Sequence, residues 1–320
     1  MRVKFDMRWN GKKVLITGSM GIIGRALVSR LVSESAQLLS VDIKPTNWSD
    51  NSIKHVQADL SKVIPDECAS FGPEVIFHLA ATFERTIESP GYWKTSFDNN
   101  VLATHRLLEK VSSLDSLKLF VFASSYLIYD PKLYMGAIEV CSLKETDPIA
   151  PRNLVGLAKY FTERELSFLE DTERQFRAVS ARIFRVYGRG SRDVISRWIR
   201  AGLRGERIEV WGKDSRFDYI YADDVAEGLI KLAESQNAEG IVNLGSGRSR
   251  SIGEVIDILR QEIGTLQISE VVSDIPRESS QADMSLFSEM TGWTPKMTLE
   301  DGIHQIIEYE RQKIQYINNS

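Results

Sequence analysis

The N-terminal part of the chain contains a short apolar run, a glycine-rich turn and an amphipathic pattern, in that order. Residues 13–17 (KVLIT) have the length and composition of a buried strand, and the turn TGSMGIIG occupies residues 17–24. Apolar residues at helical spacing follow over residues 22–34. Glycines in such a turn let the backbone approach a pyrophosphate, and the helix N-terminus supplies free N–H groups. The order of these features predicts a dinucleotide-binding unit.

An acidic residue ends the second apolar run. Asp42 lies at about the spacing from the glycine turn at which a carboxylate binds an adenosine ribose. Its charge would repel a 2′-phosphate, so the pattern favours NAD over NADP. A solvated aspartate at a strand end is the alternative. The predicted cofactor contacts of the turn are Gly18, Met20, Gly21, Ile22, Ile23 and Gly24.

Short apolar runs then alternate with helical patterns. Further strands are expected at 38–41, 55–58, 75–80, 117–123 and 176–183, and helices at 95–112 and 154–169. Continuously apolar strands that alternate with helices are typical of a parallel sheet with right-handed crossovers. The sequence therefore predicts an α/β fold, with a Rossmann-type doubly wound parallel sheet and a smaller C-terminal substrate-binding lobe.

The pattern loosens after residue 185, where glycines separate shorter elements. We expect an NAD-binding domain over residues 1–185, with residues 217–245 returning to it. Residues 186–216 and 246–320 would form the substrate-binding lobe.

Composition and charge argue against several other partners. The chain has 40 Lys and Arg residues against 44 Asp and Glu, without a dense basic block, which argues against nucleic acid or an anionic membrane. No apolar run is long enough to span a bilayer, and the charged N-terminus lacks the apolar stretch of a signal peptide. Cys68 and Cys141 belong to no Cys/His cluster, so we expect no metal and a reducing cytoplasm.

Further motifs occur in one order along nearly the whole chain. They are Asp59-Leu60, His78-Leu79-Ala80-Ala81, Asn100-Val101, residues 122–129 (FASSYLIY), 217–225 (FDYIYADDV), 243–247 (NLGSG) and 292–295 (GWTP). With the glycine turn, they resemble the extended short-chain dehydrogenase/reductase family, in its NAD-dependent epimerase/dehydratase group, which acts on nucleotide sugars. The resemblance places Asp59, Leu60, Leu79, Ala80, Ala81 and Asn100 beside the cofactor. It also implies a nucleotide-sugar substrate and a homodimer paired through the helices near Thr95 and Leu154.

In this family a Ser or Thr hydroxyl, a tyrosine and a lysine carry the reaction, and the lysine lowers the pKa of the tyrosine and holds the nicotinamide ribose. Counting back from Tyr129, Ser125 matches the hydroxyl, and Lys159 matches the lysine without a gap. Val155 then stands where the tyrosine belongs, and valine cannot transfer a proton. The one Tyr-x-x-x-Lys string, at residues 309–313, lies in the last predicted helix, far from Ser125.

Three explanations for Val155 stay open. Another group transfers the proton, with Tyr126 as the first candidate and Glu84 as the second, although Tyr126 could instead be an aromatic that packs against the cofactor. Alternatively, Lys159 or an ordered water serves. In the third explanation the protein binds its ligands without turnover, as a sensor or a partner subunit. Leu127 replaces the glutamate base of a 4,6-dehydratase, so epimerisation or oxidation and reduction is favoured over dehydration.

Arginines supply the candidates for the substrate side. Arg185 takes the place of a family asparagine that touches the sugar nucleotide, and a guanidinium suits phosphate or carboxylate. An ion pair with a nearby acid is the alternative. Arg216, and Arg277 in a late loop, are further candidates for phosphate contacts.

Overall fold

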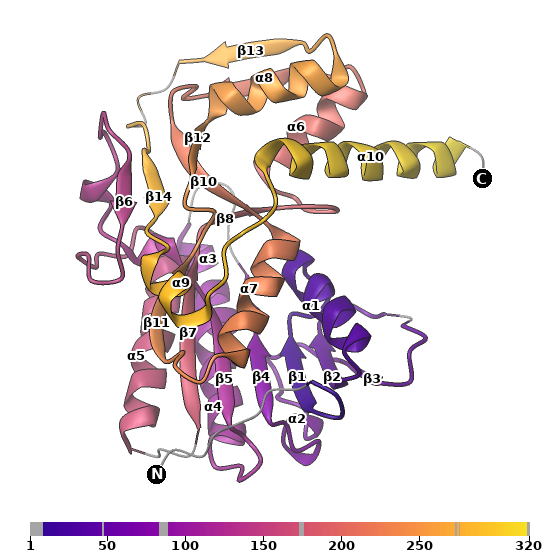
Figure 1. Ribbon diagram of the computed structural model, residues 1–320, viewed down its shortest axis with the longest axis vertical. Helices are drawn as coiled ribbons and strands as arrows, with labels where there is room; N and C mark the ends of the chain where they lie inside the picture. The colour runs from indigo at the N-terminus through magenta and orange to yellow at the C-terminus, as the bar shows by residue number, and fades with distance from the viewer. Residues whose placement is uncertain are drawn as a thin grey trace.

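The computed structural model describes residues 9–46, 48–82, 89–172, 176–272, 274 and 276–318. Its centre is a seven-stranded sheet in the order β11-β7-β5-β4-β1-β2-β3, and every neighbouring pair of strands is parallel (Figure 1). The strands are β1 (Lys13–Thr17), β2 (Gln37–Asp42), β3 (Ile53–Gln57), β4 (Val75–His78), β5 (Leu119–Ser125), β7 (Arg177–Ile183) and β11 (Gly240–Leu244). Because the order reverses at β1, this is the doubly wound sheet that the sequence predicts.

Helices cover both faces of this sheet. They are α1 (Ile22–Ser33), α2 (Glu67–Ser70), α3 (Pro90–Ser96), α4 (Ala103–Val111), α5 (Leu154–Thr172), α7 (Ala222–Glu234) and α9 (Ser285–Thr291). Leu27 of α1 and Leu229 of α7 pack with Val14 and Phe77 in the core of one face. Alternate strand residues point to the other face, where Leu15 packs in a second core with α4 and α5. The sheet is therefore buried on both sides, which explains why its strands are apolar throughout.

The expected helix over residues 95–112 is interrupted. A π-helical segment, Phe97–Leu102, lies between α3 and α4. A π-helical turn contains more residues than an α-helical turn, so it shifts which residues face the sheet. Hydrophobic periodicity does not reveal such a segment.

A smaller lobe lies above the sheet in Figure 1 and has a core of its own. Its helices are α6 (Val194–Leu203), α8 (Ile252–Ile263) and α10 (Leu299–Asn318). A three-stranded sheet joins β8 (Arg185–Tyr187), β10 (Arg216–Tyr221) and β12 (Ser249–Ser251). Two-stranded sheets pair β9 (Ile208–Trp211) with β13 (Ile268–Val271), and β6 (Cys141–Leu143) with β14 (Ser280–Ala282).

We expected residues 217–245 to return to the main sheet, but only part of this segment belongs to it. β11 joins the main sheet beside β7, and α7 packs on it, whereas β10 pairs with β8 and β12. The connection therefore begins in the lobe and ends in the sheet. Among the described helices, none is both long and apolar enough to cross a membrane.

Candidate active site

The glycine turn forms a close contact between two strand ends. Gly18 has a φ of +70°, and a Cβ atom there would lie 2.7 Å from the backbone nitrogen of Ala80. A Cβ on Gly24 would lie 2.3 Å from the carbonyl oxygen of Gly18. Any side chain at either position would displace the backbone, so the turn needs glycine because the protein's own backbone packs closely against it.

A cavity of about 350 Å³ opens above this turn. It lies where β1, β2, β3 and β4 end, which is the edge at which open α/β sheets bind ligands. The predicted cofactor residues that line it are Gly18, Gly21, Asp42, Asp59, Leu60, Leu79, Ala80 and Ala81. The structure therefore gathers into one cavity residues that are spread over a quarter of the chain.

Both acids of this cavity are held by local hydrogen bonds. The Asp42 carboxylate accepts from the backbone N–H of Met20 at 2.8 Å and from that of Lys44 at 2.9 Å. The Asp59 carboxylate accepts from the backbone and hydroxyl of Ser61, and the hydroxyl is the main reason why the pKa of Asp59 is lowered. Each carboxylate oxygen can accept more than one hydrogen bond, so Asp42 keeps lone pairs for ribose hydroxyls.

Asn100 stabilises the protein backbone. Its side chain is buried, accepts from the backbone N–H of Thr82 at 2.7 Å and donates to the Thr82 carbonyl at 2.7 Å. Asn100 thus fixes the backbone that follows β4, while the cavity wall is made by its neighbour Asn99. Asn99 is not among the residues expected from the sequence, and it lies in the π-helical segment, which hydrophobic periodicity does not reveal.

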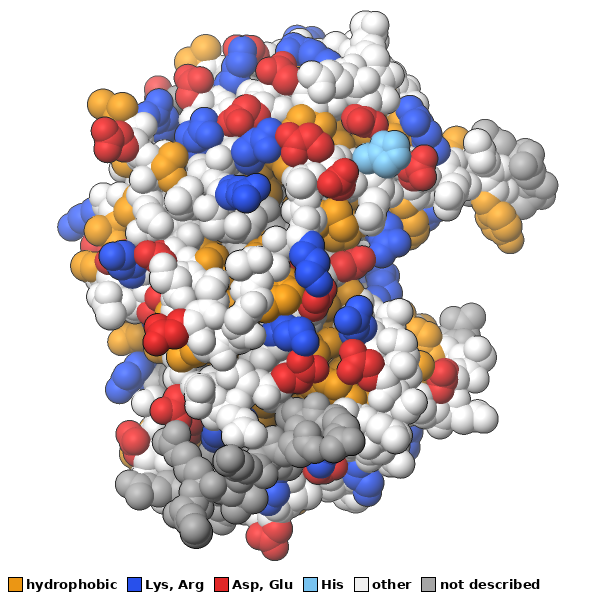
Figure 2. All heavy atoms as spheres, in the orientation of Figure 1, with side chains coloured by type: hydrophobic (Ala, Val, Ile, Leu, Met, Phe, Trp, Pro, Cys, Tyr) orange, Lys and Arg blue, Asp and Glu red, His pale blue; other side chains and the backbone are white. Residues whose placement is uncertain are grey.

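Two predicted cofactor contacts in the first helix, Ile22 and Ile23, do not line this cavity. Ile23 packs against the core of the sheet, and Ile22 lines a second, larger cavity of about 1090 Å³. That cavity lies between α1, α7 and α10, and Figure 2 shows the molecule hollowed below the projecting C-terminal helix. Acidic and basic side chains share its walls, and Asp42 and Asp59 are not among its lining residues. The glycine turn and both acids line the smaller cavity instead.

Ser125 and Lys159, the predicted reacting groups, come from neighbouring elements of the fold. Ser125 ends β5, and its hydroxyl accepts from the backbone N–H of Leu127 at 3.2 Å. Lys159 is buried in α5, with its Nζ 4.5 Å from the centre of the Phe122 ring. Burial lowers the pKa of Lys159 to about 8. Val155 is also buried and lies one helical turn before Lys159, so both face the same side of α5.

Tyr126 packs inside the protein. Its ring stacks on Phe184 with 4.9 Å between the centres, and the side chain is only 4% exposed. Burial strongly raises the pKa of this phenol. Tyr126 is therefore protonated at neutral pH and is a weak proton acceptor. The other candidate, Glu84, lies outside the described residues.

A buried ion pair fixes α5 to the sheet. Glu163 accepts from Arg182 of β7 at 2.8 and 3.0 Å and from the hydroxyl of Ser124 at 2.5 Å. Both charged side chains are at most 2% exposed, and Arg182 also lies 4.7 Å from the centre of the Tyr129 ring. Glu163 follows Lys159 by one turn, so this network sets the position of the lysine.

Arg185 lies in a charged cluster that the sequence analysis did not predict as a whole. Its Nη2 is 3.2 Å from Glu278 Oε2, and Arg152 Nη1 is 2.5 Å from the same oxygen. Glu278 is 3% exposed, and the two arginines together lower its pKa despite burial. Arg185 therefore forms the ion pair with a nearby acid that we gave as the alternative to a substrate contact. Arg152 and Glu278 carried no motif and were missed.

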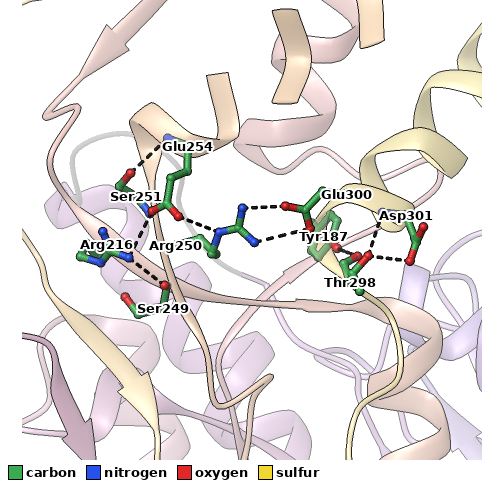
Figure 3. Close-up of polar contacts among 9 residues, drawn as sticks. All are labelled: Tyr187, Arg216, Ser249, Arg250, Ser251, Glu254, Thr298, Glu300 and Asp301. Atoms are coloured by element: carbon green, nitrogen blue, oxygen red, sulfur yellow. Dashed lines mark hydrogen bonds and ion pairs between the residues drawn. The ribbon is translucent and has the colours of Figure 1, made fainter. Parts of the chain in front are cut away.

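The other two predicted arginines contact protein groups. Arg277 donates to the carbonyl oxygens of Ala137 and Ile138 at 3.0 and 2.5 Å, so it holds the loop before β6. Arg216 donates to the Ser249 carbonyl and pairs with Glu254, each at 3.1 Å (Figure 3).

Figure 3 shows that the chain of charges continues from Glu254 through Arg250 to Glu300 at the start of α10. These arginines connect parts of the lobe. Within the described part of the chain, no group of His, Cys, Asp and Glu side chains could hold a metal ion.

Comparison with known proteins gives consistent results. The family model described as "NAD dependent epimerase/dehydratase family" matches residues 14–245. The putative UDP-glucose 4-epimerase of Methanocaldococcus jannaschii is 29% identical over 311 residues, which cover 92% of this chain and 97% of that protein. The UDP-glucose 4-epimerase of Mycolicibacterium smegmatis is 26% identical over 322 residues, 95% of this chain and all of that protein.

Among solved structures, MoeE5 in complex with UDP-glucose and NAD superposes with a TM-score of 0.81. It is 29% identical, with 94% of this chain and 99% of that chain covered.

Proposed function

Because this chain belongs to the NAD-dependent epimerase/dehydratase family, we propose that it oxidises and re-reduces a nucleotide-linked sugar, as an epimerase does. The observation that carries the proposal is the arrangement of two sites on one sheet edge. The cavity with the glycine turn, Asp42 and Asp59 lies at the ends of β1 to β4, and Ser125 ends the adjacent β5. A cofactor in the cavity and a sugar at Ser125 would be neighbours.

The residues of the cavity fit an adenine dinucleotide. Gly21 lines the cavity at the N-terminus of α1, where free N–H groups suit a pyrophosphate, and Asp42 can accept from ribose hydroxyls. Bound NAD would supply a hydride acceptor that also returns the hydride. The protein itself would orient the sugar through Ser125 and would hold the amine of Lys159 in α5.

The proton of the sugar hydroxyl needs an acceptor within the protein. Val155 cannot accept it, and burial keeps Tyr126 protonated. Lys159 has a pKa of about 8, so a substantial share of its side chains is neutral at pH 7 to 8. On these grounds we rank Lys159, directly or through a water molecule, ahead of Tyr126. The expected contrast is that Tyr126→Phe keeps turnover, whereas Lys159→Met abolishes it.

The first experiment identifies the ligands. Purified protein is denatured, and the small molecules released are identified by mass spectrometry. The expected result is NAD together with a nucleotide sugar, which is then supplied as substrate and followed for conversion by chromatography. If neither compound is released and none of the common nucleotide sugars is converted in the presence of NAD, the proposal fails.

Asp42 provides a test of cofactor choice. Removing its charge in Asp42→Asn should weaken NAD binding about tenfold and reduce the discrimination against NADP, because a carboxylate both accepts from the ribose and repels a 2′-phosphate. Affinities are measured by titration calorimetry, and Asp50→Asn, an acid outside the cavity, is the control. Equal affinity of the unaltered protein for NAD and NADP would contradict this role.

A binding function without turnover is the second candidate, and Val155 is the observation that favours it. Such a protein would hold NAD and a sugar nucleotide as a sensor or as a partner subunit. Conversion of a nucleotide sugar by the isolated protein, lost in Lys159→Met, would exclude this candidate.

We also propose a homodimer. Large apolar side chains remain exposed on two neighbouring helical segments, with Trp93 and Phe97 on one and Leu157, Phe161 and Phe168 on α5. Three of them recur along one side of α5, and such a contiguous apolar surface is typical of an interface. A second copy of this chain is the occupant that we propose, in the helix pairing expected from the sequence. Both cysteines are free thiols, which supports a reducing compartment such as the cytoplasm.

A further inference from the structure

The cluster around Glu278 carries more positive than negative charge. Arg152 and Arg185 share the single carboxylate of Glu278, so the three side chains sum to one positive charge. Among the described acids, Asp193 lies near Tyr219, and its carboxylate caps α6 by accepting from Ser196. Glu278 is buried, whereas the side chains of Arg152 and Arg185 are 28% and 35% exposed, so an anion can reach the excess positive charge from solvent.

The tyrosines around the cluster do not supply that negative charge. Burial raises the pKa of Tyr134 to about 12 and raises the pKa values of Tyr126 and Tyr219 further. All three phenols are therefore neutral hydrogen-bond donors at physiological pH. The hydroxyl of Tyr126 reaches Glu278.

Three donors of this cluster are unused within the described part of the chain. The Nε of Arg185 and the hydroxyls of Tyr134 and Tyr219 are buried and have no hydrogen-bond partner there. Tyr219 as a whole is 6% exposed. The guanidinium of Arg185 lies 3.7 Å from the centre of the Phe217 ring, so stacking fixes its plane. Fixed, unused donors next to an uncompensated positive charge are suited to an oxyanion.

The cluster lies at the sugar end of the proposed site. Tyr126 directly follows Ser125, and its ring stacks on Phe184, the residue before Arg185. The cofactor cavity is on the other side of β4, where β1, β2 and β3 end. An oxyanion bound here would therefore sit on the sugar, close to the hydroxyl that Ser125 orients.

We propose that Arg185, supported by Arg152 and Glu278, recognises a carboxylate on the sugar ring, so that the substrate is a nucleotide-linked uronic acid. This inference rests on the proposed function and specifies its substrate class. One excess positive charge matches a single carboxylate, whereas a diphosphate carries about two negative charges. Glu278 orients both arginines and limits the charge of the cluster to that value.

The test compares the affinities of UDP-glucuronic acid, UDP-glucose and UDP for the protein in the presence of NAD, by titration calorimetry. UDP-glucuronic acid should bind at least about tenfold more tightly than UDP-glucose, a typical value for charge-assisted hydrogen bonds. Arg185→Gln should remove that advantage and leave the affinities for UDP-glucose and UDP within about twofold. Arg250→Gln, an arginine of similar exposure that is paired in the lobe, should change none of the three.

Two results would overturn the proposal. One is the absence of a preference for UDP-glucuronic acid in the unaltered protein. The other is an equal loss for all three nucleotides in Arg185→Gln, which would place the cluster on the diphosphate. Thermal unfolding confirms that each variant folds, and Arg185→Lys, which keeps the charge but loses the planar fork, should retain part of the preference. Binding of none of the three compounds by the unaltered protein would overturn the proposed function as well.

Discussion

At the scale of single residues, the candidate site combines a hydroxyl and a lysine with a valine that cannot carry a proton. Ser125 and Lys159 come from β5 and α5, and Val155 lies one turn before the lysine. The lysine is 7% exposed, and this burial favours its neutral form. Under the proposed function, the chemistry of the site would depend on how readily Lys159 releases and regains its proton.

Restoring a phenol tests whether Val155 limits the reaction. Val155→Tyr should raise the turnover number at least tenfold, because a positioned general acid–base group contributes 10²–10⁴-fold in typical enzymes. Turnover is measured by chromatography with the nucleotide sugar identified on the protein. Val155→Phe adds the same ring without the hydroxyl and should give no increase. Equal rates for both variants would show that the missing phenol is not the limiting factor.

The pKa of Lys159 also predicts how stability depends on pH. The unfolded chain keeps this ammonium up to about pH 10.5, whereas the folded protein releases the proton near pH 8. Between these values the unfolded state binds more protons, so raising the pH favours the folded state, by about 3 kcal/mol in total.

This contribution is measured as a difference between two proteins. Urea unfolding of the unaltered protein and of Lys159→Met is followed at pH 7.5 and pH 10. The free energy of unfolding of the unaltered protein should rise relative to that of the variant. Other titrating groups are common to both proteins and cancel, so a constant difference would show that Lys159 titrates near its ordinary pKa.

At the scale of elements, the Glu163–Arg182 pair decides where α5 lies on the sheet. Its atoms join α5 to β7, and the hydroxyl of Ser124 extends the contact to β5. A buried pair contributes little net stability compared with apolar packing, but it specifies one arrangement when every hydrogen bond is made. Here it fixes the helix that carries both Val155 and Lys159.

Breaking this pair should be severe. Arg182→Met leaves Glu163 buried without a counter-charge, and we expect a loss of about 3–5 kcal/mol in the free energy of unfolding. The double variant Glu163→Gln/Arg182→Met should lose less than the sum of the two single variants, because no unpaired charge remains. Urea denaturation measures all four proteins. Additive losses would mean that the two side chains do not interact across the helix–strand interface.

At the scale of the whole molecule, the chain forms two packed regions and leaves an apolar surface uncovered. The sheet and the lobe have separate cores, and the ion-pair chain of Figure 3 ties α8, β12 and α10 together within the lobe. The exposed apolar side chains lie on α3, the π-helical segment and α5. This is the surface through which we propose that the dimer forms.

Introducing a charge into that surface tests the dimer. Phe161 is 50% exposed on α5, and Phe161→Glu should convert a dimer into a monomer, because an unpaired carboxylate would be buried at the interface. Size-exclusion chromatography with light scattering measures the mass. Val272→Glu places the same charge on an exposed residue of the lobe and should leave the dimer intact. A monomeric unaltered protein at micromolar concentration would contradict the assignment.

The sequence by itself determined the parts of this protein that follow from local pattern. Apolar runs with interspersed helical periodicity specify a parallel sheet, because only strands buried on both faces are apolar throughout. The glycine turn and Asp42 identified one side of the cofactor cavity, because strand ends of a parallel sheet meet at one edge. Val155, Ser125 and Lys159 could be placed by counting from neighbouring motifs.

Only the tertiary structure decided the contacts between distant residues. Arg152 and Arg185 meet Glu278 across 126 and 93 positions of the chain, and Tyr126 turned inward onto Phe184. Asn99 of the π-helical segment, and not Asn100, lines the cavity. Side-chain partners at such separations depend on how the lobe packs over the sheet, and periodicity and spacing carry no information about that packing.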